Sequence, residues 1–267
     1  MKRLVFATAI ALAATLAHAI DERKADELLQ KNENSDAINQ LKLLADQGDM
    51  VAQDRVGLAY LSGRGIEKDL DAARNWLQKA ADQGYAFSQA RLGFIYANGL
   101  GVEKDLDRAA YWYAKAGEQG NVAASYNLGL LYSAGVHLKK DDIAAAKWFR
   151  IAAEKGLAEA QFNLGVLYMG ESFKHDYAEA LRWMSKAADA GNGQAMLNIG
   201  GMYEYGWGVK KDDATALEWY RKAAAAGDWM AMGKISDAYK AGMLGLEKDP
   251  AKAKEWYEKY FEAQVKR

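Results

Sequence analysis

Six side chains suited to hydrogen bonding recur along this chain at nearly constant intervals. Three carry positive charges and three carry amides, and they follow one another every 35 or 36 residues: Arg55, Arg91, Asn127, Asn163, Asn198 and Lys234. Guanidinium and ammonium groups bind carboxylates, whereas an amide both donates and accepts hydrogen bonds, as the backbone of an extended peptide requires. The row therefore predicts a surface that binds a peptide segment. The alternative is a structural role, in which each asparagine fixes the loop beside it.

The residues that enzymes use do not converge in the sequence. Of the three histidines, His18 lies near the N-terminus, and His137 and His175 fall in different loops without the spacing of metal ligands. No serine is followed three residues later by lysine, and no Walker glycine loop, G-x-S-x-G or H-E-x-x-H motif is present. We therefore expect no enzyme activity, no cofactor and no metal site.

The polar row belongs to an internal repeat of 35 or 36 residues. Each copy opens with a glycine, and these glycines are Gly48, Gly84, Gly120, Gly156, Gly191 and Gly227. A second glycine follows nine residues later in five copies, and Ser236 replaces it in the sixth. The six repeats run approximately over 48–83, 84–119, 120–155, 156–190, 191–226 and 227–264, after an N-terminal capping half-repeat at 20–47.

Each repeat is expected to form two helices. The first helix of the second repeat ends near Gly99, where glycine suits a left-handed helix C-cap. The second helix of every repeat begins after an aspartate, which caps free backbone N–H groups: Asp69, Asp105, Asp141, Asp176, Asp212 and Asp249. Pro250 follows the last of these, at the position where its missing N–H is harmless.

The glycines inside the first helices predict close contacts between helices. Each costs about 1 kcal/mol of helix propensity relative to alanine, so their recurrence indicates that no larger side chain fits there. The position that is tryptophan in all six full repeats is Gln40 in the segment before the first repeat. A polar residue is what the outer face of a terminal repeat requires, so residues 20–47 are expected to form a cap.

The first residues resemble a secretory signal peptide. Lys2 and Arg3 precede an apolar run to Ala17, and Ala17-His18-Ala19 matches a cleavage site after Ala19. We expect residues 1–19 to be removed and the remainder to reside in the periplasm with no integral membrane segment. After cleavage 33 basic and 36 acidic residues remain, a net charge of −3, and no basic run is left to bind nucleic acid. The chain has no cysteine, so its stability depends on packing.

The repeat, A-x-Q/S-x-x-L-G-x-x-Y-x-x-G-x-G-V followed by D-x-x-x-A-x-x-W-Y-x-K-A-A-x-x-G, closely resembles the Sel1-like repeat, a relative of the tetratricopeptide repeat. The resemblance covers residues 36 to about 264. It implies an all-α, right-handed superhelix (solenoid) of helix pairs, with the first helices lining a concave surface. It also implies a scaffold or regulator that binds other proteins. Local departures, at His137, at Gly170–Phe173 and at Met243-Leu244, affect only loops.

The resemblance leaves two further classes of function open. Some exported Sel1-like proteins are described as β-lactamase-like, but this chain lacks the serine-lysine pair of that mechanism. Binding of carbohydrate or peptidoglycan would need a row of exposed aromatic rings, and the repeated tryptophans and tyrosines are expected to be buried. The favoured function is therefore the binding of an envelope or signalling protein on the surface formed by the first helix of each repeat, here called the first-helix face.

Two other sets of residues bear on that face. The position ten residues after each leading glycine is apolar in four repeats, Leu58, Phe94, Leu130 and Val166. This row either is buried between repeats or forms an apolar strip beside the polar row, and we expect burial. Near the C-terminus five large residues lie outside the repeat pattern and form either a docking patch or a lid on the last repeat: Trp207, Trp229, Met230, Met232 and Met243.

Overall fold

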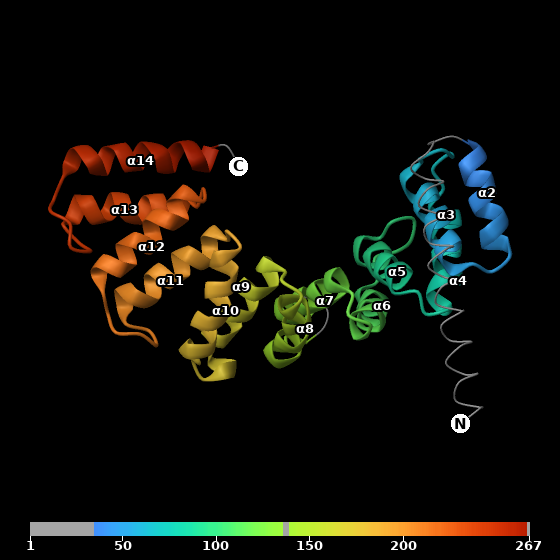
Figure 1. The fold of residues 1–267 in the computed structure, drawn as a ribbon, viewed down its shortest axis with the longest axis horizontal. Helices are drawn as coiled ribbons and strands as arrows, with labels where there is room; N and C mark the ends of the chain where they lie inside the picture. Colours follow the sequence, from blue (N-terminus) through green and yellow to red (C-terminus); the bar gives the residue numbers. More distant parts are fainter. Residues whose placement is uncertain (1–34, 136–138, 266–267) are drawn as a thin grey trace, which may run out of the picture. The chain divides into compact units, whose positions relative to one another are not determined.

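The computed structural model describes residues 35–135 and 139–265, and this part of the chain forms thirteen α-helices and one short 3-10 helix (Figure 1). After α2 (Ser35–Asp46), the first helices of the six repeats are α3 (Met50–Ser62), α5 (Ala86–Asn98), α7 (Val122–Ala134), α9 (Ala158–Tyr168), α11 (Gly193–Tyr205) and α13 (Trp229–Ala241). The second helices are α4 (Leu70–Asp82), α6 (Leu106–Glu118), α8 (Asp142–Glu154), α10 (Tyr177–Asp189), α12 (Asp213–Ala225) and α14 (Pro250–Val265). The all-helical repeat fold is confirmed, whereas the expected signal peptide and the start of the half-repeat lie outside the described residues.

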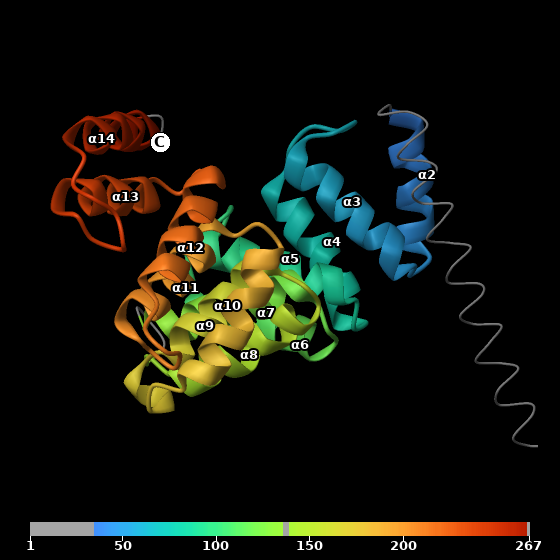
Figure 2. The same ribbon diagram turned by 60° about the vertical axis from the view of Figure 1, so that its left-hand side comes forward.

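Two compact units make up the chain, and the division falls within α7. One unit extends to Leu131, and the other comprises residues 132–135 and the chain from Lys139 onward. Within each unit, helices adjacent in sequence pack against each other, as α3 does on α4 and α11 does on α12 (Figures 1 and 2). Within each unit these contacts link one helix pair to the next, as α4 to α5 and α10 to α11, which is what a stacked repeat requires.

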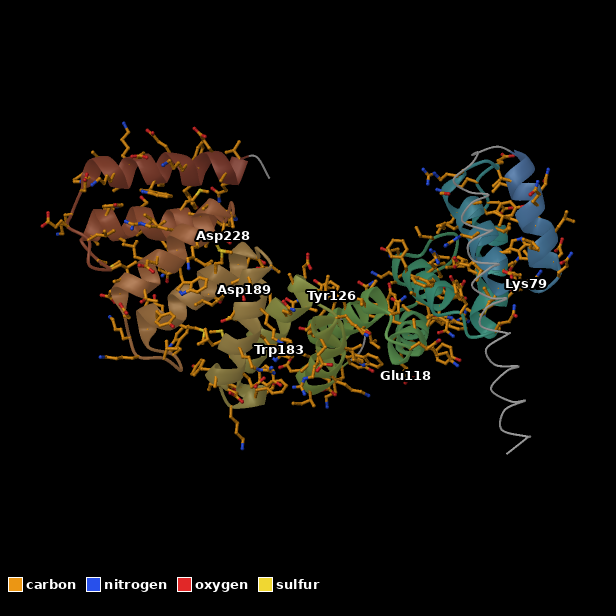
Figure 3. The ribbon with its side chains drawn as sticks, in the orientation of Figure 1. Lys79, Glu118, Tyr126, Trp183, Asp189 and Asp228 are labelled. Atoms are coloured by element: carbon orange, nitrogen blue, oxygen red, sulfur yellow. The ribbon has the colours of Figure 1, made fainter. Side chains whose placement is uncertain are left out.

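The predicted helix caps are present. All six aspartates accept backbone N–H groups in the first turn of a second helix; Asp105 Oδ1, for example, lies 2.9 Å from the amide nitrogen of Arg108. Helix α14 begins at Pro250, directly after its cap. Helix α5 ends at Gly99, whose φ of 67° is left-handed. Asp228, labelled in Figure 3, caps α13 in the same way from the turn after α12.

The interior follows the repeat. The repeated tryptophans and tyrosines are buried or half-buried; Trp183, on α10 in Figure 3, is almost fully buried. Gln40 on α2 is exposed, in agreement with its predicted position on a capping face. Glutamines pair within a repeat, where the side chain of Gln83 donates to that of Gln53 at 2.8 Å and Gln119 donates to Gln89 at the same distance. Gln89 also joins its repeat to the one before, because its side chain donates to the carbonyl oxygen of Ala81 at 3.1 Å.

The fourth repeat differs at the loop that the sequence singled out. Its shorter connection contains the 3-10 helix η1 (Glu171–Phe173) in place of a glycine turn. His175 follows with a φ of 56°, and its Nδ1 lies 2.7 Å from the carbonyl oxygen of Met169. This histidine is an exposed loop residue, and His137 lies outside the described residues.

The glycines inside the first helices lie where a second helix approaches most closely. A Cβ atom added to Gly57, Gly93, Gly165 or Gly200 would stand 2.5 to 2.7 Å from a side chain of the partner helix. The partner residues are Leu77, Tyr113, Met184 and Tyr220. In the last repeat Ser236 takes this place and donates a hydrogen bond of 2.7 Å to the carbonyl oxygen of Ala253. The predicted close approach of the two helices is confirmed at these positions.

Adjacent glycines on α11 offer a matched test of this packing. A Cβ on Gly200 would lie 2.6 Å from Tyr220 Cε1, whereas a Cβ on Gly201 meets nothing nearer than Tyr220 Oη at 3.8 Å. We expect Gly200→Ala to lower the free energy of unfolding by about 2 kcal/mol through overpacking. Gly201→Ala should be neutral or raise it by up to about 1 kcal/mol, because alanine favours the helix. Urea unfolding of the two variants measures the difference, and equal effects would contradict the packing explanation.

Candidate functional site

In the described part of the chain, two grooves are lined mainly by first helices, and they lie in different units. The groove in the first unit, here called the N-terminal groove, measures about 670 Å³ and is lined by α3, α5, the first turns of α7 and the side chain of Tyr113. The groove in the second unit, the C-terminal groove, measures about 520 Å³ and is lined by α11, α13, Tyr220 and residues of α14. Each is large enough to take one or a few side chains of a bound molecule.

Six of the eight residues predicted for binding line these grooves. Arg91 and Asn127 lie in the N-terminal groove. Asn198, Lys234, Trp207 and Trp229 come together in the C-terminal groove. Arg55 and Asn163 lie in neither. The structure thus divides the predicted row between two sites instead of extending it as one line of donors.

The apolar row at Leu58, Phe94, Leu130 and Val166 is not buried, and our expectation of burial was wrong. Phe94, Leu130 and Val166 retain 49, 39 and 42% of their accessible surface, and Leu58 is half-buried. These positions follow the close-approach glycine by one residue, which turns them out of the contact between the two helices. Leu58 and Phe94 instead form part of the apolar wall of the N-terminal groove.

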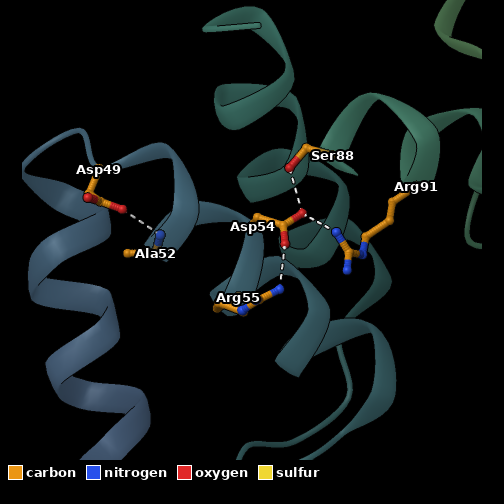
Figure 4. Close-up of polar contacts among 6 residues, drawn as sticks. All are labelled: Asp49, Ala52, Asp54, Arg55, Ser88 and Arg91. Atoms are coloured by element: carbon orange, nitrogen blue, oxygen red, sulfur yellow. Dashed lines mark hydrogen bonds and ion pairs between the residues drawn. The ribbon is translucent and has the colours of Figure 1, made fainter. Parts of the chain in front are cut away.

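A buried carboxylate fixes the charged residue of the N-terminal groove. Asp54 on α3 is fully buried and accepts hydrogen bonds at Oδ1 from Arg91 Nη1 at 2.6 Å and from Ser88 Oγ at 2.7 Å, while Arg55 Nη1 lies 3.4 Å from Oδ2 (Figure 4). Burial raises the pKa of Asp54 above its ordinary range, although both arginines and the serine favour the charged form. Asp54 was not among the predicted site residues, and a lone aspartate at a core-facing helix position was the available signal.

Tyrosines of the second helices reach both grooves across the helix glycines. Tyr113 packs on Gly93 and its hydroxyl is hydrogen-bonded to Asn127, while burial raises the pKa of Tyr113 to about 12. Tyr220 packs on Gly200 in the same manner and donates to Glu204. The first and fourth repeats carry Leu77 and Met184 at this position, the third carries Phe149, and the sixth carries Tyr257, which also lines the C-terminal groove. The exchange to tyrosine is a sequence signal for the grooves that we did not use.

The polar part of the C-terminal groove is a charge pair surrounded by aromatic rings. Lys234 Nζ lies 3.2 Å from Glu204 Oε2 and 3.3 Å from the hydroxyl of Tyr205. Burial disfavours the charged lysine, but its hydrogen bonds to Tyr205 and Glu204 outweigh this effect and raise the pKa of Lys234. Asn198 donates instead to the carbonyl oxygen of Gln194 in its own helix, at 2.8 Å. The contacts with Glu204 and Tyr205 thus hold Lys234 in place at the groove.

Of the five large residues outside the repeat pattern, three line the C-terminal groove, one packs in the core and one does neither. Trp207 and Met230 line the C-terminal groove and are exposed, and Trp229 lines it while packing on Tyr260, with ring centroids 5.4 Å apart. Trp207 stacks on the ring of Tyr177 at 6.1 Å. Met232 instead packs against the hydrophobic core, and Met243 is exposed outside the groove. Three of the five residues thus contribute to a surface that a bound molecule can reach.

The charged side chains that line the grooves are Arg91 in the N-terminal groove and Lys234 and Asp237 in the C-terminal groove. Within the described ranges, no three histidine, aspartate or glutamate side chains are placed to share a metal ion. The helices of the same part of the chain are too short or too polar to cross a membrane. What the grooves offer is hydrogen bonding and apolar contact.

The fold defines an α-helical repeat protein in which grooves lie along the first helices of both units. The chain belongs to the Sel1 repeat family, whose model matches six times, at residues 51–85, 86–121, 122–157, 158–192, 193–228 and 229–260. No curated protein matches the chain.

Two solved structures are similar in both sequence and fold. One is c5321, a protective antigen of uropathogenic Escherichia coli strains, with 37% identity over 84% of this chain and a TM-score of 0.76. This chain spans only 48% of that protein. The other is a Sel1 repeat protein from Oxalobacter formigenes, with 34% identity, 90% coverage of this chain, 96% coverage of that chain and a TM-score of 0.72.

The buried cluster at Asp54 predicts a pH-dependent effect of Arg91. Replacing Arg91 by glutamine removes a charge that favours the ionised carboxylate, so the pKa of Asp54 should rise further. A raised pKa lowers stability only once the pH exceeds the ordinary value of 3.8; the loss grows until the pH reaches the folded-state pKa and is constant above it. We expect Arg91→Gln to lose about 2 kcal/mol at pH 7 and clearly less at about pH 4, as measured by urea unfolding.

Arg108→Gln is the control for this measurement. Arg108 pairs with Asp105 at 3.2 Å on the surface of the same unit, and its side chain is exposed. An exposed pair contributes little, so this variant should lose less than about 1 kcal/mol at either pH. An Arg91→Gln deficit that does not change with pH would show that Asp54 is not responsible.

Proposed function

We propose that this protein is a non-enzymatic scaffold or regulator that binds a segment of another protein in the grooves of its first-helix face. The observation that supports this most directly is the exposure of large apolar side chains there. Phe87 and Phe94 in the N-terminal groove and Tyr205 and Trp207 in the C-terminal groove are all exposed, and none is required by the repeat. Aromatic side chains next to fixed polar groups are typical of sites that dominate the energy of protein binding.

The proposal assigns different tasks to the two kinds of residue in each repeat. The glycines, aspartates and buried aromatic residues hold the helix pairs together, and these tasks are the same in every repeat. The groove residues change from repeat to repeat, as expected if they match one particular partner. The partner would be a protein of the cell envelope or of a signalling system, reached through export to the periplasm by residues 1–19 as the sequence suggests.

Site-specific photocrosslinking tests the binding surface. A benzophenone amino acid would replace Phe94 or Trp207 in the grooves, and matched variants would carry it at Tyr111 or Ile143, which are equally exposed on the second helices α6 and α8. We expect irradiation of cells to give one discrete protein adduct from a groove position and none from its control, because only groove residues contact the partner. Adducts of equal yield from groove and control positions would exclude the first-helix face as the binding site.

A second candidate function is supported by the aromatic residues of the C-terminal groove. Carbohydrate binding requires exposed rings on which a sugar can stack. The repeated tryptophans do not provide them, but Tyr205, Trp207 and Tyr257 are exposed in this groove beside Lys234. The groove therefore offers both stacking surfaces and a hydrogen-bond donor.

Calorimetric titration with soluble muropeptides separates the two functions. If carbohydrate binds, Trp207→Ala should weaken binding at least tenfold through the loss of stacking, about 1.4 kcal/mol. Phe94→Ser, in the other groove, should leave it unchanged. Because the proposed partner is a peptide segment, we expect no heat of muropeptide binding with the wild-type protein or with either variant. Saturable binding to the wild-type protein that is lost in Trp207→Ala would favour the carbohydrate function.

A further inference from the structure

We propose that the N-terminal groove selects a partner segment in which a carboxylate lies beside a large apolar side chain, and that Arg91 binds this carboxylate. The inference rests on the proposed function and adds the chemistry of the segment. Four features of the groove support it. These are the exposed phenylalanines of α5, the charge of Arg91, the hydrogen bond that holds Arg91 on Asp54, and the start of α7.

The apolar part of the site is a wall of exposed side chains. Phe87 and Phe94, both on α5, are 56 and 49% exposed, and they lie one helical turn on either side of the arginine. Leu58 and Leu61 of α3 continue the wall. The exposed half of each phenylalanine ring is apolar area that a bound apolar side chain would remove from water, at about 25 cal/mol per Å². The groove therefore favours a large apolar residue.

The polar part of the site is a single cation. Of the residues that line the N-terminal groove, only Arg91 carries a charge. Its Nη1 donates to Asp54, and its guanidinium lies 6.0 Å from the centre of the Phe87 ring. Within the described residues it has no other hydrogen bond, although a guanidinium has five N–H donors. The remaining donors suit a carboxylate, which binds arginine through two oxygens.

Asp54 positions the guanidinium without neutralising the site. It carries one negative charge and faces two arginines, Arg55 of its own helix and Arg91 of the next repeat (Figure 4). Because Asp54 is fully buried and also accepts from Ser88, its position is fixed by the core. Arg91 is thereby held in one orientation, so a partner does not have to immobilise a flexible side chain on binding.

The start of α7 adds a second positive contribution. Gly120, Asn121 and Val122, at the N-terminal end of this thirteen-residue helix, line the same groove. Asn121 Oδ1 accepts from the amide of Ala124 at 2.9 Å, and the helix dipole favours an anion near the same end. No acidic residue occupies the first turn of α7 to offset this effect. The helix end and Arg91 therefore favour the same sign of charge in the ligand.

The C-terminal groove lacks this preference and provides an internal control. It is lined by Lys234 and Asp237, and the ammonium of Lys234 is paired with Glu204. With both signs of charge in or beside it, this groove has no reason to select an acidic segment. A charge preference that depends on Arg91 but not on Lys234 would thus arise in the N-terminal groove.

Selection from a phage-displayed library of random dodecapeptides tests the inference. The target is the chain from residue 20 to residue 267, and parallel selections use Arg91→Gln and Lys234→Gln. We expect wild type and Lys234→Gln to enrich peptides with Asp or Glu within three residues of Phe, Leu or Trp. Arg91→Gln should lose the acidic preference and keep the apolar one. An acidic preference that persists in Arg91→Gln would overturn the assignment.

A second measurement does not depend on the stability of the variant. The best peptide would be synthesised with its acidic residue and with the isosteric amide, and both would be titrated into the wild-type protein. We expect the amide to bind about tenfold more weakly, and the difference to shrink at high salt. Equal affinities would overturn the inference but leave peptide binding on the first-helix face intact. Failure of the library to enrich any peptide over a blank surface would overturn both proposals.

Discussion

The close approach of the two helices in each repeat is the constraint on which the rest of this structure depends. A glycine in the first helix lets a large side chain of the second helix lie directly against its backbone, as Tyr113 does on Gly93 and Tyr220 does on Gly200. The contact fixes the rotation of each first helix about its axis. That rotation in turn determines which of its residues are buried in the pair and which remain on the first-helix face.

The same contact shapes the grooves. The side chains of Leu77 and Met184 pack against the glycine between the two helices. A tyrosine at this position is longer, and its hydroxyl reaches the groove on the first-helix face. Tyr113 meets Asn127 there, and Tyr220 meets Glu204. Both hydroxyls are polar groups near a buried surface and require partners. The packing position thereby brings hydrogen-bonding side chains together at the edge of each groove.

Buried polar contacts add to the apolar packing that joins neighbouring repeats. Gln53 and Gln89 are buried, donate to the carbonyl oxygens of Ala45 and Ala81, and accept from glutamines that precede the next repeat. Gln161 makes the first of these bonds, but its Oε1 has no partner in the described chain, and Ala190 stands where the first two repeats have Gln83 and Gln119. The Asp54 cluster adds an ionic link between two repeats at the one place where a buried carboxylate occurs on a first helix in the described chain.

The sequence by itself determined the features that depend on neighbours along the chain. Helix caps at Asp105 and Asp249, the left-handed end at Gly99 and the close-approach glycines follow from local backbone chemistry and from the repeat, so they could be predicted. The tertiary structure alone decided the rest. It exposed Phe94 although its position is apolar, united Arg91 with Asp54 across 37 residues, and separated Asn163 from the grooves. These outcomes depend on how each helix is rotated against its partner, and a small rotation moves a residue between core and surface without changing the repeat.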